Sequence, residues 1–450
     1  MKQLSIFQTV LLAVFGALAV AGVLIFAFAI GGSTSTSLGP VQIWGTLDAT
    51  AFSAVLQHLA ENDPSLAQVT YIQKDPATFD SDVTKALASG TGPDLILISQ
   101  DYAYKDSPEI VPIPPTAMSR TQFQNTFIDA ANPFVSSSGA LAIPLLADPL
   151  VLYWNKDLLA SAGFSRPPAY WGELPAIAQK VNVQDSSGAL SKSAIDLGTY
   201  SNVDHAKNIL ATLIMQAGGS ITGFDSSGHL ISTIVPKGST ASGAAQNALS
   251  FFTEFANPSL STYSWSSAQP DAQQAFTAGD LALYIGYASE EPAILRGNSN
   301  LNFGESLLPQ ASSTTLLSSA RVWGLAATRG SKNPSAAITV AAALATPANA
   351  AAFSTAFGIP SARRDVLSAA AAKGIPQQLV SSDDLCKGVD PAVCSAQVAE
   401  TWVDPDPAAT DGIFQAMIDN TTSGAMLVTE ALQRADQQLS QLLNSTQPSS

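Results

Sequence analysis

Hydrophobic and polar positions recur along the chain with two periods, which predict strands and helices in turn. The run Val41-Gln42-Ile43-Trp44 predicts a strand, and apolar residues spaced three and four apart predict a helix over 48–62. A strand at 69–73, a helix around 79–87 and a strand at 94–98 follow. Strands and helices that alternate with short connections are typical of a mostly parallel sheet covered by helices. The pattern therefore predicts the α/β fold class.

The alternation resumes after an irregular, proline-rich stretch at 108–115. Further strands are predicted at 142–145, 150–154, 280–287 and 321–328. Further helices are predicted at 156–162, 171–181, 206–217, 241–255 and 272–278, and the alanine-rich tail beyond Asn333 is helical in pattern. Because 450 residues exceed the usual size of one domain, we expect the fold to be divided into two lobes.

The first 40 residues contain a long uncharged apolar run. The 21 residues from Val10 to Ile30 could cross a hydrocarbon layer of about 30 Å as a helix, so we expect an N-terminal transmembrane anchor. A cleaved signal peptide is the alternative, because Ala27-Phe28-Ala29 has the form of a cleavage site. The only nearby cation, Lys2, precedes the run, which predicts that the folded part lies outside the cytoplasmic membrane.

The charge balance narrows the classes of ligand. The chain has 20 Lys and Arg residues against 35 Asp and Glu residues, a net charge of −15. Nucleic acids and other phosphate-rich polyanions need cations on their partner, so they are excluded as expected ligands. Only 12% of residues are charged, and this composition suits a protein that handles neutral polar matter.

The two cysteines, Cys386 and Cys394, are expected to form a small disulfide loop, since the compartment is predicted to be oxidising. The three histidines, His58, His205 and His229, are isolated and lack the spacing of metal ligands, so neither a metal site nor a cofactor is expected.

Sequence motifs of common enzyme classes are missing. The chain has no G-x-S-x-G elbow, no H-E-x-x-H sequence and no lysine after a glycine for a phosphate-binding loop. A glycoside hydrolase that uses two aspartates stays conceivable, but no pair stands out. We therefore expect a binding protein and not an enzyme.

Four segments, in order, carry a family resemblance: VQIWGTLD at 41–48, ALASGTGPDLILI at 86–98, IPLLADPLVLYWNKDLLASAGFSRPPAYWGEL at 143–174, and the stretch from Ala275 to Asp365. Together they resemble the extracellular solute-binding proteins of ABC importers, in particular the sugar-binding family that includes maltose-binding protein. Two features depart from that family. No lipid-anchor cysteine lies near residue 30, and Asp280 stands where a Lys or Arg is common.

The resemblance implies a two-lobed periplasmic-binding-protein fold of type II. Residues 1–40 would form the anchor and linker, 41–148 plus 287–320 the first lobe, and 152–284 plus 322–442 the second. The hinge is expected near Asp148, Gly286 and Arg321. A ligand would bind in the cleft and be enclosed on closure. The implied partners are a sugar and the permease subunits of an ABC transporter, and the chain is expected to be a monomer.

Sugars present apolar C–H faces and a ring of hydroxyls, which aromatic rings and polar side chains recognise in a concave site. Residues of these kinds near the expected strand ends and crossings are the candidates for ligand binding: Trp44, Thr46, Asp48, Gln100, Asp101, Asp148, Trp265, Tyr287, Glu290, Trp323 and Arg363. Structural roles compete with this interpretation. Asp48 has the position of a helix cap, and Trp171 is assigned to the core.

Other ligands fit the same scaffold. The acidic balance would also admit a polyamine or a peptide, with Asp48, Asp148 and Glu290 as counter-charges. The sequence does not distinguish these ligands from a mono- or oligosaccharide.

Overall fold

The computed structural model describes residues 38–446 except 187, 237–242, 314, 374–385 and 387. The predicted anchor at 10–30 lies outside the described residues. Within them, no single helix has the length and apolar character of a membrane span. The helices α11 (Pro334–Leu344) and α12 (Pro347–Phe357) meet those criteria only as a pair, bent by 71°.

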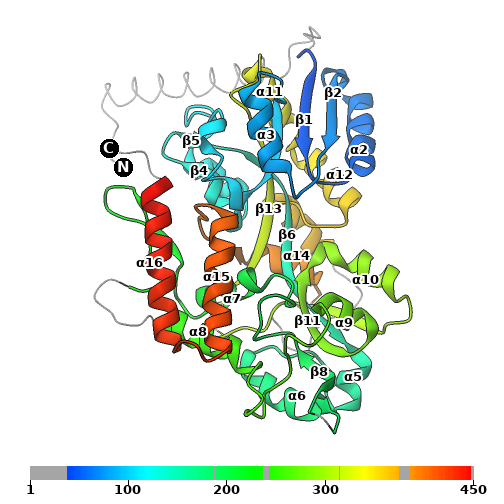
Figure 1. Cartoon of the computed structure of the whole chain (residues 1–450). Helices are drawn as coiled ribbons and strands as arrows, with labels where there is room; N and C mark the ends of the chain where they lie inside the picture. Colours follow the sequence, from blue (N-terminus) through cyan, green and yellow to red (C-terminus); the bar gives the residue numbers. More distant parts are fainter. Residues whose placement is uncertain are drawn as a thin grey trace, which may run out of the picture.

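A ten-stranded mixed sheet runs through the molecule in the order β2-β1-β3-β13-β6-β11-β8-β7, with β12 beside β6 and β14 beside β13 (Figure 1). β1 pairs in parallel with β2 and β3, as the sequence predicted, whereas β13 joins β3 and β6 in antiparallel fashion. Its strands are β1 (Val41–Gly45), β2 (Val69–Gln73), β3 (Leu95–Ser99), β6 (Ile143–Asn155), β7 (Val183–Gln184), β8 (Leu190–Ile195), β11 (Leu281–Tyr287), β12 (Phe303–Ser306), β13 (Ser318–Ala327) and β14 (Ala399–Glu400). Two small hairpins complete the strands: β4 (Val135–Ser136) with β5 (Gly139–Ala140), and β9 (Thr222–Phe224) with β10 (Leu230–Ser232).

Helices cover the sheet, as the alternating pattern predicted. Those that pack mainly with the upper lobe of Figure 1 are α2 (Ala49–Asn62), α3 (Phe79–Ala88), α4 (Arg120–Thr126), α11, α12 and α13 (Arg364–Lys373). Those of the lower lobe are α5 (Lys156–Ser161), α6 (Leu174–Val181), α7 (Ala206–Gln216), α8 (Gly243–Glu254), α9 (Ala272–Ala278), α10 (Glu291–Gly297), α15 (Pro407–Thr422) and α16 (Val428–Thr446). One more helix, α14 (Pro391–Gln397), lies between the lobes.

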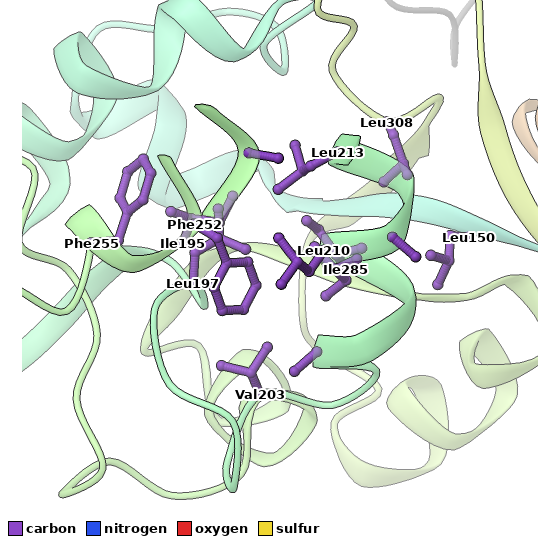
Figure 2. Packing of buried hydrophobic residues seen from close by; sticks show 14 of the residues in the cluster. Leu150, Ile195, Leu197, Val203, Leu210, Leu213, Phe252, Phe255, Ile285 and Leu308 are labelled. Carbon is purple, nitrogen blue, oxygen red and sulfur yellow. The ribbon is translucent and has the colours of Figure 1, made fainter. Parts of the chain in front are cut away.

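The lobes have separate hydrophobic cores, and the membership of these cores corrects the predicted lobe boundaries. The first core contains buried residues from 41–147 and 320–367, together with Ala396 and Ala399. The second contains residues from 150–308 and 414–443 together with Ala392, and part of it is drawn in Figure 2. Residues 287–308 thus pack with the second lobe and 322–367 with the first, the reverse of the prediction. The apolar pattern shows that a segment is buried but does not show in which core.

Among the described residues, we trace three segments that cross between the lobes. β6 is one strand where two were predicted: its first half pairs with β13, and its second half pairs with β11 and β12. The chain returns between Leu308 and Ser318, and crosses again between Ala399 and Trp402. Gly286, a predicted hinge residue, instead lies within β11 opposite Val151 in the second lobe.

Cys386 and Cys394 form the predicted disulfide, with their Cα atoms 5.9 Å apart. The bond attaches the middle of α14 to the chain ahead of the helix, and both cysteines are buried beside Leu307. α14 packs against β6, β12 and β13, the strands at the joint between the lobes. The disulfide therefore fastens a helix that supports the joint.

Candidate ligand-binding cleft

A cavity of about 650 Å³ lies between the two lobes. The first lobe contributes polar groups, Thr46, Asp80, Ser99, Asp101 and Tyr102, and apolar groups, Leu47, Pro76, Phe79, Leu97, Ile98, Trp323, Phe357 and Ile359. Lys207, Asn208, Ser289, Pro407, Ala408 and Asp411 line it from the second lobe, and Arg321 lines it at the joint. The cavity lies at the carboxyl ends of β1 and β3, which is where open α/β sheets usually bind ligands.

The end of β3 brings a carboxylate to the cavity wall. A short 3-10 turn at Gln100–Tyr102 follows the strand, and Ser99 Oγ accepts a hydrogen bond from the Asp101 backbone N–H at 3.4 Å. Burial raises the pKa of Asp101, while the charges of Lys207 and Arg321 oppose the rise. Asp101 thus presents a hydrogen-bond acceptor to the cleft, within the electrostatic range of both cations.

Gln100 has a supporting role and does not line the cavity. Its side chain is 2% exposed, accepts a hydrogen bond from the Val322 N–H at 2.5 Å and donates to Asp101 Oδ1 at 2.9 Å. It joins β3 to β13 and orients Asp101. The strand-end rule correctly located this segment, but alternation of side chains directs Gln100 away from the cleft.

Of the three candidates in or just after β1, Trp44, Thr46 and Asp48, only Thr46 lines the cavity. The Trp44 indole donates to Gln42 Oε1 at 2.8 Å, and Lys74 Nζ lies 3.6 Å from the centre of its ring. Asp48 accepts a hydrogen bond from the Ala51 N–H at 2.8 Å and caps α2. Asp48 therefore has the structural role that competed with ligand binding in the sequence.

Asp148 and Arg321 meet at the joint between the lobes, opposite one another on β6 and β13. The Asp148 carboxylate is fully buried, accepts from Arg321 Nη2 at 2.9 Å, and also accepts from the Ser289 N–H and Oγ at 2.9 and 2.7 Å. Burial raises the pKa of Asp148, and the Arg321 charge opposes the rise. Asp148 lies behind the cavity wall, where its partners occupy both carboxylate oxygens.

Two candidate aromatic rings lie close to the guanidinium group of Arg321. Its central carbon is 4.4 Å from the ring centre of Tyr287 and 4.5 Å from that of Trp323. Asn208 Nδ2 donates a hydrogen bond to the Tyr287 hydroxyl at 2.8 Å, which helps to hold the ring in place. Trp323 lines the cavity itself, whereas Tyr287 supports the residues that do.

Glu290 is the centre of a hydrogen-bond network in the second lobe and does not line the cavity. It pairs with His205 Nε2 at 2.5 Å, accepts from Gln273 Nε2 at 2.9 Å and is also bonded by the Tyr284 hydroxyl. Burial acts to raise the pKa of Glu290, but the hydrogen bond and charge of His205 bring it below the usual value. The network fixes the start of α7, where His205 adopts a left-handed backbone with φ of 62°.

Two candidates lie away from the cleft. Trp265 is fully buried in the core of the second lobe, where its backbone N–H bonds to the Phe255 carbonyl. Arg363 pairs with Asp365 at 2.7 Å and donates to the Ala345 carbonyl at 3.0 Å. Trp171 is in the core of the second lobe, as predicted.

The sequence interpretation missed several polar wall residues of the second lobe. Lys207 and Asn208 come from the first turn of α7, and Asp411 comes from α15 in the alanine-rich tail. Tyr102, in contrast, directly follows two named candidates and could have been included by the same rule. No local pattern marks Asp411, because only folding brings it to the cleft.

The cations of the wall are already paired. Lys207 Nζ donates to Asp404 Oδ2 and to Thr410 Oγ1, both at 2.7 Å, in a largely buried position. Burial raises the pKa of Asp404 to about 6, and the Lys207 charge opposes the rise. With Arg321 paired to Asp148, the cavity offers flat rings, hydroxyls, an amide and carboxylates. Among the described residues, no group of three or more His, Cys, Asp and Glu side chains has the geometry of a metal site.

A curated protein is similar in sequence to part of this chain. A binding protein of Brucella abortus strain 2308 is 24% identical over 231 residues, which cover 50% of this chain and 52% of the relative. The chain thus matches about half the length of this curated relative.

Solved structures match over nearly the whole chain. The cyclic α-maltosyl-1,6-maltose binding protein of Arthrobacter globiformis is 18% identical, with 90% of this chain and 100% of that one covered and a TM-score of 0.71. The GacH receptor of Streptomyces glaucescens is also 18% identical, over 90% and 98% of the two chains, with a TM-score of 0.66. An ABC transporter solute-binding protein of Thermotoga lettingae, solved with α-D-tagatose, is 18% identical over 90% and 100%, with a TM-score of 0.65.

The sequence model of the bacterial extracellular solute-binding proteins matches residues 58–377, most of the folded chain. The structural matches support the same two-lobed fold. The chain therefore belongs to the family of bacterial extracellular solute-binding proteins, as the sequence resemblance predicted.

Proposed function

We propose that this protein captures a carbohydrate between its lobes and delivers it to an ABC-type permease. The observation that carries the proposal is the composition of the cavity wall. Phe79, Tyr102 and Trp323 supply rings for the apolar faces of a sugar, while Asp101 and Asn208 supply hydrogen-bonding groups for its hydroxyls. A ligand that contacts both lobes at once would bind the closed conformation more tightly than the open one, and would therefore select it.

The related structures support a carbohydrate over other solutes. One is named for binding a cyclic maltosyl-maltose, one was solved with α-D-tagatose, and the GacH receptor was solved in complex with acarbose. The cavity of about 650 Å³ exceeds the volume of a single sugar ring, so it could hold a short oligosaccharide.

The site that we propose consists of the residues that line the cavity with polar or aromatic groups: Thr46, Phe79, Asp80, Ser99, Asp101, Tyr102, Asn208, Trp323 and Asp411. Gln100, Asp148, Tyr287 and Glu290 support these residues from behind. The same wall favours one rival ligand, a polyamine, because three of its members are carboxylates.

We also propose that residues 10–30 anchor the protein to the outer face of the cytoplasmic membrane, where it would meet its permease. Fractionation of cells that express the full chain should place it in the membrane pellet, and a chain that lacks residues 1–30 behind a cleavable leader should be released. Release of the full chain would show instead that the apolar segment is removed.

A ligand panel tests the binding proposal. Thermal unfolding of the purified protein should shift upward with at least one mono- or oligosaccharide, and calorimetry should give a saturable affinity for it. The sugar should be recovered unchanged after prolonged incubation. A shift with spermidine and none with any sugar would replace the carbohydrate by a polyamine, and release of reducing ends would indicate a hydrolase.

A further inference from the structure

Three contacts hold the side chain of Arg321 at the joint between the lobes. The central carbon of its guanidinium lies 4.4 Å from the ring centre of Tyr287 and 4.5 Å from that of Trp323, and Asp148 accepts a hydrogen bond from Nη2 at 2.9 Å. A planar guanidinium that contacts two aromatic rings and is hydrogen-bonded at one end cannot change its orientation without losing these contacts. Its remaining N–H groups therefore point in fixed directions.

The guanidinium keeps a donor available for a ligand. Its side chain is 33% exposed and lines the cavity, while Nε is buried. Within the part of the chain that the structure describes, Nη2 makes its one hydrogen bond, and Nη1 makes none. Nη1 is thus a preorganised hydrogen-bond donor at the cavity wall.

The charge of this donor is already balanced. Asp148 is fully buried and directly paired with Arg321. Burial acts to lower the pKa of Arg321, but Tyr287, Asp148 and Asp101 together raise it above the usual value. Lys207, the other cation of the wall, is paired with Asp404. A carboxylate or phosphate on the ligand would therefore meet Asp101 without an unpaired cation to compensate for its desolvation.

We propose that Arg321 is a ligand-contacting residue that restricts the cleft to neutral carbohydrates. Its Nη1 donates a hydrogen bond to a hydroxyl or ring oxygen, while Asp101 accepts one from a hydroxyl and disfavours acidic sugars. Asp148 acts as a positioning residue, because it both orients the guanidinium and cancels its charge. This inference rests on the proposed function and adds the class of sugar.

The experiment compares neutral sugars with uronic acids on the full-length protein in detergent. Calorimetry measures the affinity for a set of neutral oligosaccharides that includes maltotriose, and for trigalacturonate as the acidic probe. The wild type should bind at least one neutral sugar and bind trigalacturonate at least a hundred-fold more weakly. Arg321→Met, which keeps much of the stacked volume but has no donor, should weaken neutral-sugar binding roughly ten-fold or more.

Two further variants guard against a folding defect. Arg321→Lys keeps the charge beside Asp148 but loses Nη1 and the planar stack, so it should weaken binding while the unfolding temperature changes little. Asp148→Asn should reduce the discrimination against trigalacturonate at least ten-fold. Arg329→Met is the matched control, since Arg329 is an exposed arginine that donates to the Pro108 carbonyl, and it should bind as the wild type does.

Equal binding of neutral and acidic sugars by the wild type would overturn the inference and leave the proposed function intact. The same conclusion would follow if Arg321→Met and Arg321→Lys, both folded by circular dichroism, bound the neutral sugar as the wild type does. Failure of the wild type to bind any sugar would overturn the proposed function, and the inference with it.

Discussion

Lys105 of the first lobe and Asp406 of the second form an ion pair across the cleft, with Nζ and Oδ2 3.8 Å apart. Lys105 also pairs with Asp80 of its own lobe at 2.8 Å, and Asp80 lines the cavity. Asp406 is the N-cap of α15, the helix that brings Asp411 to the cleft. Because the partners belong to different lobes, opening of the cleft separates them.

Loss of this ion pair should weaken ligand binding by a small factor. Partly exposed pairs contribute about 0.2–1 kcal/mol, so Lys105→Met should raise the dissociation constant roughly 1.5- to 5-fold by favouring the open form. Asp406→Asn removes the opposite charge of the same ion pair yet keeps an oxygen that can cap α15. Calorimetry at low and high salt is the measurement.

The dependence of ligand affinity on salt distinguishes loss of the ion pair from a general folding defect. The difference between the wild type and each variant should shrink at 1 M salt, where charges on the surface are screened. A loss of affinity that persists unchanged at high salt would show that Lys105 acts by another route.

Trp265 and Trp323 should respond to truncation in opposite ways. Trp265 is fully buried in a core, so Trp265→Ala should lower the free energy of unfolding by about 3–5 kcal/mol. Trp323 lines the cleft, so Trp323→Ala should weaken sugar binding at least ten-fold. Urea unfolding and calorimetry on both variants are the measurements. Weaker binding by a fully stable Trp265→Ala protein would restore Trp265 as a ligand contact.

Local periodicity was sufficient to predict the layered α/β fold. The helix expected over 48–62 is observed at Ala49–Asn62, with Asp48 as its cap, and the strand expected at 94–98 is β3. The assignment of segments to lobes was not predictable in the same way. A run such as 281–287 is buried on both faces, and its sequence does not encode which core it joins.

The residues of the candidate site were predictable only where they directly follow a predicted strand in the sequence. Thr46 and Asp101 directly follow strands, and both line the cleft. Lys207 and its partner Asp404 are separated by 197 residues, so no local pattern connects them. Trp265 could not be assigned for a different reason. A tryptophan suits a hydrophobic core and a sugar-binding site equally well, so the residue type alone does not show which of the two it joins.

Stability should fall as pH rises because of Asp106. Burial raises its pKa to about 8, and the carboxylates of Asp80 and Glu109 add to the shift. An unfolded aspartate ionises near pH 3.9, so between about pH 4 and 8 the folded state binds more protons than the unfolded state. The contribution of Asp106 is therefore present below pH 4 and is lost as pH rises through this window.

Asp106→Asn removes this dependence. Relative to the wild type, the variant should gain on the order of 1–3 kcal/mol of unfolding free energy at pH 8 and almost nothing at pH 4. Urea unfolding at several pH values measures the difference. Glu61→Gln is the control, because Glu61 is 76% exposed and loses the same charge. Parallel pH curves for the wild type and Asp106→Asn would contradict the prediction.

Reduction of the Cys386–Cys394 disulfide should loosen the joint between the lobes. The bond closes a loop of sequence separation 8, for which the chain-entropy model gives about 2–3 kcal/mol. α14 lies against β6, β12 and β13, so the effect should spread to the crossing strands. The Cys386→Ser, Cys394→Ser double variant should unfold at lower temperature and exchange its amide hydrogens faster in 388–400 and 143–155. Reductant should reproduce this in the wild type and change nothing further in the variant. If faster exchange stayed confined to 388–400, α14 would be a local element that does not support the joint.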